Sequence, residues 1–120
     1  MTFLEELNHI VDACGLPVET GVFSGKAPDA YVVITPLTDM FSLFADNRPQ
    51  AGVNEASLSI FTKKNYKEHK TAILRALVDA DFTITDCRYI DYEISTKYYH
   101  YYISVAKTHE WSEENGDNRA

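Results

Sequence analysis

The chain has 120 residues, of which 45% are hydrophobic and 24% charged, and its formal net charge is −7. This length and composition fit one globular domain. The net negative charge excludes a protein that binds nucleic acid through a basic stripe. The chain has no run of about 18 apolar residues, so no membrane span is expected. Its acidic start, Met1–Glu6, lacks the basic region of a signal peptide, and we expect a cytoplasmic protein.

The first predicted element is a helix over residues 2–14. Thr2 and Glu5 form a capping-box pattern at its start, and apolar residues then recur at helical spacing. Gly15 and Pro17 end the helix.

Two strands follow, which we expect to form a first hairpin. Pro17–Phe23 reads as a short strand, and residues 24–29 are rich in turn formers. Residues 30–37 form the more distinct strand, because the run Tyr31-Val-Val-Ile-Thr35 is aromatic and β-branched.

Residues 38–52 mix apolar side chains with turn formers. Met40, Phe41, Leu43 and Phe44 are apolar, whereas the following Asp46-Asn-Arg-Pro49 segment is typical of a turn. We therefore predict a long loop or arm, with a short strand through residues 41–45. A loop of this length in a small domain is usually functional.

A strand and a helix come next. Residues 53–62 alternate, which predicts that Ala56, Leu58 and Ile60 point inward. Asn65 caps a helix over residues 66–79, and basic residues gather at the entry and along this helix. These basic residues form either a solvated surface or an ion-pairing surface for an acidic neighbour, and they are Lys63, Lys64, Lys67, Lys70 and Arg75.

The last ordered stretch, residues 88–106, carries six of the eight tyrosines. It predicts two strands joined by a turn at Ser95–Lys97, with residues 82–87 leading into the first strand. Alternation sets one face as Tyr99, Tyr101, Ile103 and Val105, and the other as Tyr98, His100, Tyr102 and Ser104. A small domain needs only one apolar sheet face, so the second aromatic face predicts contact with a partner.

These elements define the expected fold class. The order is α-β-β-(arm)-β-α-β-β, which predicts an α+β, two-layer domain with a mainly antiparallel sheet packed by two helices. The domain is expected to span residues 1–107. Residues 108–120 are acidic and polar, and we expect a disordered tail.

No motif of catalysis or cofactor binding is present in the sequence. Cys14 and Cys87 are far apart and predict free thiols. The histidines fall on different elements, and Asp46 with Arg48 fits loop stabilisation better than acid–base chemistry. We therefore expect no enzyme, no cofactor and no metal site.

The organisation resembles a family of phage proteins. The shared features are the helix ending Cys14-Gly-Leu-Pro-Val-Glu19 and the Gly21-Val-Phe23 that follows, the strand Tyr31–Thr35, the segment Phe44-Ala-Asp-Asn-Arg-Pro-Gln50, the strand Ala56–Thr62 with its Asn65-Tyr66 helix, and the tyrosine hairpin. Across residues 3–107 this order is similar to the small tail-terminator, or tail-completion, proteins and the related neck or minor tail proteins of long-tailed bacteriophages and prophages.

The resemblance implies a non-enzymatic structural protein of the virion, made in the bacterial cytoplasm. Members assemble into rings, commonly hexameric, that join the tail tube to the head and let DNA pass through a channel. The implied interface residues are Phe41, Phe44, Asp46, Arg48, Lys63, Lys64, Lys67, Tyr98, His100 and Tyr102. The alternative is a small cytosolic regulatory module that binds a ligand or a protein, with the tyrosine face lining a pocket.

Overall fold

The computed structural model describes residues 2–20, 28–45 and 48–110. Its elements, in chain order, are α1 (Phe3–Ala13), β1 (Val18–Thr20), β2 (Ala30–Ala45), β3 (Arg48–Thr62), α2 (Tyr66–Asp79), β4 (Thr83–Glu93) and β5 (Tyr98–Glu110). The sheet order is β1-β2-β3-β5-β4. The expected α+β class, with two helices and a mainly antiparallel sheet, is confirmed.

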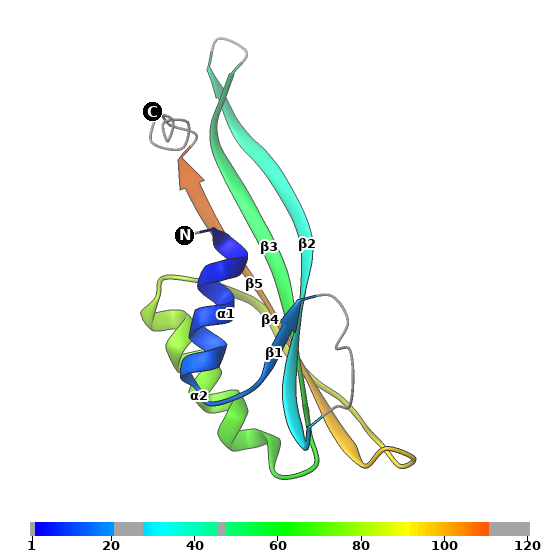
Figure 1. The fold of residues 1–120 in the computed structure, drawn as a ribbon. Helices are drawn as coiled ribbons and strands as arrows, with labels where there is room; N and C mark the ends of the chain where they lie inside the picture. Colours follow the sequence, from blue (N-terminus) through cyan, green and yellow to red (C-terminus); the bar gives the residue numbers. More distant parts are fainter. Residues whose placement is uncertain (1, 21–27, 46–47, 111–120) are drawn as a thin grey trace.

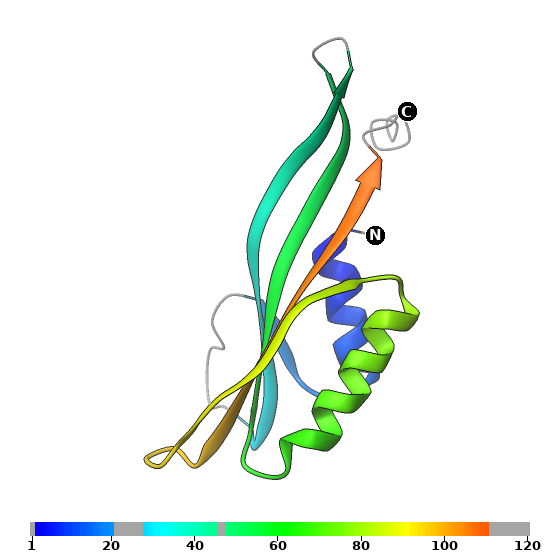
Figure 2. The ribbon, with the colours of Figure 1, turned by 180° about the vertical axis from the view of Figure 1, so that it is seen from behind.

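Both helices lie on the same side of the sheet (Figure 1). α1 packs on β1 and β2, whereas α2 packs on β3, β4 and β5. In the view from behind, both helices again lie on one side of the sheet, and no described helix lies on the other side (Figure 2). No helix in the described part of the chain combines the length and apolarity needed to cross a membrane.

Local sequence signals set the helix ends. The N–H of Glu5 donates to Thr2 Oγ1 (3.1 Å) and the N–H of Thr2 donates to Glu5 Oε1 (2.9 Å), which completes the capping box. Gly15 has φ +85°, the left-handed conformation that ends a helix. The Asn65 side chain accepts from the N–H of Lys67 (2.9 Å) at the start of α2.

The core lies between the helices and the central strands. The predicted inward residues Ala56, Leu58 and Ile60 are fully buried, which confirms the prediction for β3. The cross-strand row Ile34, Leu58 and Ile103 shows how one face of three strands meets the helices. The helices add four fully buried side chains to this core, namely Leu7, Val11, Ile73 and Leu77.

The predicted first hairpin is wrong. β1 pairs parallel to β2, with Val18 opposite Val32 and Thr20 opposite Ile34. The N–H of Val32 donates to the carbonyl of Pro17 (2.9 Å), which fixes this register where the chain leaves α1. The antiparallel partner of β2 is instead β3, because a long hairpin joins these two strands directly.

The prediction of a long loop at residues 38–52 is also wrong, because the described backbone of this segment is β-strand. β2 and β3 pair continuously beyond the core, from Pro36 opposite Ala56 to Ala45 opposite Arg48. The pairing shifts register at three places on β2, and these irregularities accommodate residues that do not fit a regular ladder. We call residues 38–53 the arm, which extends past the helices in Figure 1, while the β4–β5 hairpin projects at the opposite end.

The boundary of the predicted tail also changes. β5 continues to Glu110, so Thr108–Glu110 belong to the sheet and pair with Ala51–Val53 of β3. The remaining residues of that prediction, 111–120, lie outside the described residues. The turn between β4 and β5 falls at 94–97, next to the predicted position.

The buried row gives a direct test of the core. Ile103→Ala should lower the free energy of unfolding by about 2–5 kcal/mol, because Ile103 is fully buried and its truncation leaves a cavity. Ile94→Ala, the same change at a side chain that is 81% exposed, should stay within about 0.5 kcal/mol of the parent. Urea unfolding measures both values, and equal losses would contradict the assigned faces.

Candidate functional site

The side of the sheet opposite the helices carries a row of rings. Tyr31 of β2, Phe61 of β3 and His100 of β5 are direct cross-strand neighbours, and Asp91 of β4 completes the row. Because side chains alternate, these residues point away from the core that holds their neighbours Val32, Ile60 and Tyr101. We call this surface the aromatic face, and it consists of Tyr31, Phe61, Tyr98, His100 and Tyr102.

The rings of the aromatic face pack on one another. Phe61 stacks on His100 with centroids 4.3 Å apart and on Tyr31 at 5.1 Å. Tyr98 meets Tyr31 edge-on at 5.5 Å and donates its hydroxyl proton to the carbonyl of Pro28. Aromatic pairs of this kind contribute about 0.5–1.5 kcal/mol each. The cluster is therefore built into the fold, yet all five residues remain only partly buried.

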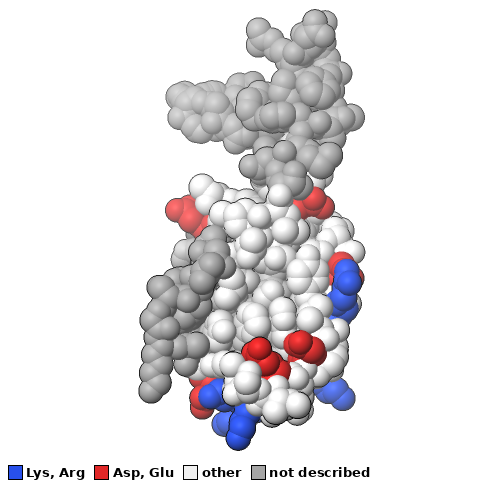
Figure 3. Space-filling model, turned by 90° about the vertical axis from the view of Figure 1, so that its right-hand side faces the viewer, with Lys and Arg blue, Asp and Glu red and all other residues white. Residues whose placement is uncertain are grey.

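Charged residues lie around this surface rather than in its middle. Figure 3 looks onto the side opposite the helices, and the described part of it is mostly uncharged, with acids and bases towards its lower end and margins. An uncharged centre with a charged margin is the usual anatomy of a protein–protein contact.

His100 lies near the middle of the aromatic face. Its Nε2 atom is buried and has no hydrogen-bond partner among the described residues. Desolvation lowers the pKa of His100, and the nearby Asp91 carboxylate opposes this only partly. The neutral imidazole is therefore favoured in the folded chain.

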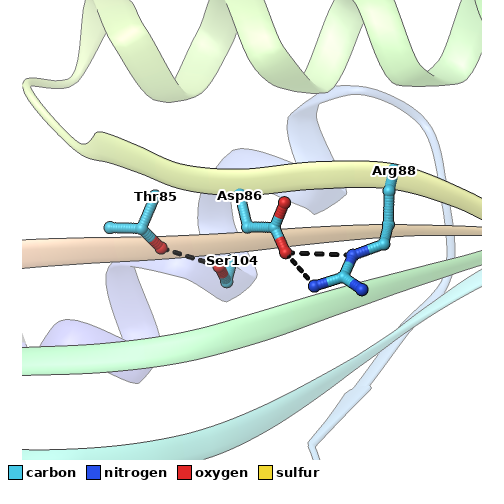
Figure 4. A network of polar contacts seen from close by, with 4 residues as sticks. All are labelled: Thr85, Asp86, Arg88 and Ser104. Carbon is cyan, nitrogen blue, oxygen red and sulfur yellow. Dashed lines mark hydrogen bonds and ion pairs between the residues drawn. The ribbon is translucent and has the colours of Figure 1, made fainter.

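A polar network lies on β4 and β5 (Figure 4). Thr85 and Ser104 share a hydrogen bond of 2.6 Å across β4 and β5, and Arg88 donates to the carboxylate of Asp86 on the same strand. The guanidinium of Arg88 also lies over the ring of Tyr102, 5.7 Å from its centroid. These contacts place polar groups of β4 next to the aromatic face.

The opposite face of the tyrosine hairpin belongs to the core. Tyr101 is 7% exposed and stacks on Tyr66 of α2 with centroids 5.3 Å apart. Burial raises the pKa of Tyr101 to about 12, and a hydrogen bond with Cys87 adds to the increase. Lys70 lies over the same ring at 5.2 Å. This face is thus packed against α2, whereas no described helix packs on the aromatic face.

The predicted basic residues lie at the turn between β3 and α2. Lys63 approaches Asp29 (3.9 Å) and lies over the ring of Tyr98 at 5.2 Å, so it borders the aromatic face. Lys64 and Lys67 are exposed, and Lys64 lines a hollow of about 380 Å³ with Tyr66 and Tyr99 on the helix side.

The other predicted interface residues lie on the arm. Phe41 pairs with Gly52, Phe44 with Pro49, and Arg48 with Ala45, all through the backbone. Asp46 lies outside the described residues. The structure therefore brings together Tyr98, His100, Tyr102 and Lys63, and it does not place the arm residues beside them.

Sequence reasoning missed two members of the aromatic face. Tyr31 and Phe61 form its centre with His100, although neither was among the predicted interface residues. The signal was available for Phe61, because inward Leu58 and Ile60 require Phe61 to point outward. The partner strand of Tyr31 was not predictable from its own segment.

The described residues contain no group of three or more His, Cys, Asp or Glu side chains able to hold a metal ion. No protein-family model matches the chain, and no curated protein matches it either.

The buried imidazole predicts an acid-dependent loss of stability. The folded-state pKa of His100 lies below its ordinary value of 6.5, so its contribution is complete above pH 6.5 and is lost as pH falls through the folded-state pKa. His100→Phe, which keeps a ring next to Phe61, should lose less unfolding free energy than the parent between pH 6.5 and 5.

Urea unfolding at several pH values measures this difference. His9→Phe makes the same change at an exposed position of α1 and is the matched control. If His100→Phe shows the same acid dependence as the parent, His100 is not the group responsible.

Proposed function

We propose that the chain is a non-enzymatic structural protein that assembles into a ring of the tail-terminator or head–tail joining kind. Copies would contact one another through the arm and the aromatic face. The protein would be made in the bacterial cytoplasm and incorporated into the virion, where it would contact tail-tube and head–neck proteins.

The arm is the observation that carries this proposal. β1 reaches only Ile34 of β2, so from Thr35 to Ala45 the outer edge of β2 has no neighbour among the described residues. On the other side, β5 ends at Glu110 opposite Ala51. Among the described residues, the end of the arm is therefore a two-stranded ribbon, and such ribbons are marginal in water by themselves. A second protein surface would stabilise it.

The aromatic face supplies a second, different surface. An arm on one copy and a flat face on the next make a head-to-tail contact, and such contacts close into a ring when the rotation fits. The rings at the centre suit the buried part of an interface, and Lys63 with Lys64 and Lys67 would suit its margin. Six copies are the number that the family resemblance implies.

The net charge fits a channel through which DNA passes. A chain with a formal charge of −7 repels phosphates, so DNA would slide past the ring without adhering. Tight binding of duplex DNA at low salt would argue against this part of the proposal.

One feature favours the alternative, a small binding module. A hollow of about 580 Å³ lies where α1 meets the root of the arm, between Thr2, Phe3 and Leu4 on one side and Pro36, Leu37, Asn54 and Glu55 on the other. Its size is within the range of small-molecule sites. A ligand bound there by a stable monomer would favour this alternative over the ring.

Removal of the arm distinguishes the ring-forming structural protein from the small binding module, because only the ring is proposed to need the arm. Replacement of Met40–Val53 by Asn-Gly closes β2 and β3 with a two-residue turn just beyond the pair Asp39–Asn54. The fully buried core residues lie outside the replaced segment, so the variant should fold and fail to form the ring. Native mass spectrometry and light scattering at several concentrations, with and without tail-tube protein, measure assembly.

The matched control changes the other hairpin. Replacement of Ser95-Thr96 by Asn-Gly alters the β4–β5 turn without shortening a strand and should assemble like the parent. The proposal fails if the parent chain stays monomeric under every condition, or if the variant without the arm assembles equally well.

A further inference from the structure

In the described part of the chain, no strand pairs with the outer edge of β4, and apolar side chains of this strand are exposed. β4 is the last strand of the sheet and is 11 residues long. Six large apolar side chains are exposed in the described part of the chain, and four of them lie on β4 or the turn that follows: Tyr89 (45%), Ile90 (42%), Tyr92 (40%) and Ile94 (81%). A free edge with apolar side chains is a template for pairing with another strand.

The charges of β4 are arranged for pairing with a copy of itself. Arg88 lies opposite Tyr102, Asp91 opposite His100, and Glu93 opposite Tyr98, so these three charges share the outer face of the sheet with Asp86, which pairs with Arg88 along the strand. In an antiparallel pair, residues on the same face meet across the strands, and diagonal neighbours are also within reach. Between residues 88 and 93 the base precedes the two acids, so this stretch is complementary to its own reversed copy.

We propose that two copies of the chain pair edge to edge through β4 around a two-fold axis. The register sets Arg88 of one copy opposite Glu93 of the other, with Asp91 of that second copy as its diagonal neighbour. The same register sets Tyr89 opposite Tyr92 on the helix side. A two-fold axis through a sheet edge makes the new pair antiparallel, and the two sheets join into one of ten strands.

The existing contacts of β4 permit this pairing. Arg88 now pairs with Asp86, but its side chain is 63% exposed and can turn towards another carboxylate. Natural edges are commonly blunted by charges and bulges, and β4 has both, including a register shift between Tyr89 and Asp91. In the proposed register the charges that meet across the axis have opposite signs, so they favour a copy of this strand and disfavour unlike edges.

This contact goes beyond the proposed ring. It uses neither the arm nor the stacked rings, and it predicts a dimer whether or not a head-to-tail ring forms. The two proposals can therefore fail separately.

Charge reversal tests the pairing directly. Arg88→Glu puts like charges opposite Glu93 of the other copy, and the double variant Asp91→Lys with Glu93→Lys puts like charges opposite Arg88. Each variant should weaken dimerisation at least about tenfold, because like charges across an interface are strongly unfavourable. A mixture of the two variants should restore it, since every cross-strand pair then has opposite signs.

The measurement is sedimentation equilibrium of the full chain at pH 8, with circular dichroism to verify folding. Arg75→Glu on the exposed side of α2 is the matched control for the first variant and should dimerise like the parent. A spin label on Cys87, in a Cys14→Ala background, should give a Cα separation of about 25 Å between copies, from the seven-residue offset that the register sets.

Three outcomes would overturn the proposal. The first is a parent chain that remains monomeric at high concentration, which would leave β4 free for an unlike partner. The second is a dimer or a ring that is indifferent to both charge reversals, which would place the contact elsewhere. The third is a mixture of the variants that associates no better than either one alone.

Discussion

The pairing of β3 with β5 in the middle of the sheet is the constraint on which the rest of the structure depends. These strands are in register over twelve residue pairs, from Ala51 opposite Glu110 to Thr62 opposite Tyr99. Because side chains alternate, this register decides that Ile60 and Tyr101 enter the core while Phe61 and His100 face outward. A slip of one residue would exchange the two sets, so the core and the aromatic face are two consequences of one register.

The same pairing explains why a long ribbon and one edge strand lack a further strand neighbour among the described residues. β5 occupies the position next to β3, which places β4 at the margin of the sheet. β3 and β2 continue past the end of β5, and no helix covers that end in Figures 1 and 2. The surfaces that we assign to assembly are those that the topology leaves without a neighbour in the described chain.

Local signals made much of this fold predictable from the sequence. The caps at Thr2 and Asn65 act within one helical turn, and the inward face of β3 follows from strict alternation. The parallel pairing of β1 was not predictable, because strand partners depend on contacts between distant segments. The arm was misassigned because Asp39, Pro49 and Gly52 are turn formers by propensity, whereas a ribbon with register shifts accommodates them.

The candidate site was predictable in part for the same reason. Alternation along one strand found Tyr98, His100 and Tyr102, but Tyr31 joins them only through the register of three strands. The orphaned nitrogen of His100 is a property of packing and has no signal in the sequence.

We infer that the end of the arm needs a surface from another polypeptide. Amide hydrogen exchange of residues 38–45, measured over a range of protein concentrations, tests it most directly. The account predicts that these amides exchange fast in the dilute monomer, while those of β3 and β5 within the core exchange slowly, and that arm protection rises as copies assemble. Slow exchange of the arm in a protein that stays monomeric would contradict the account.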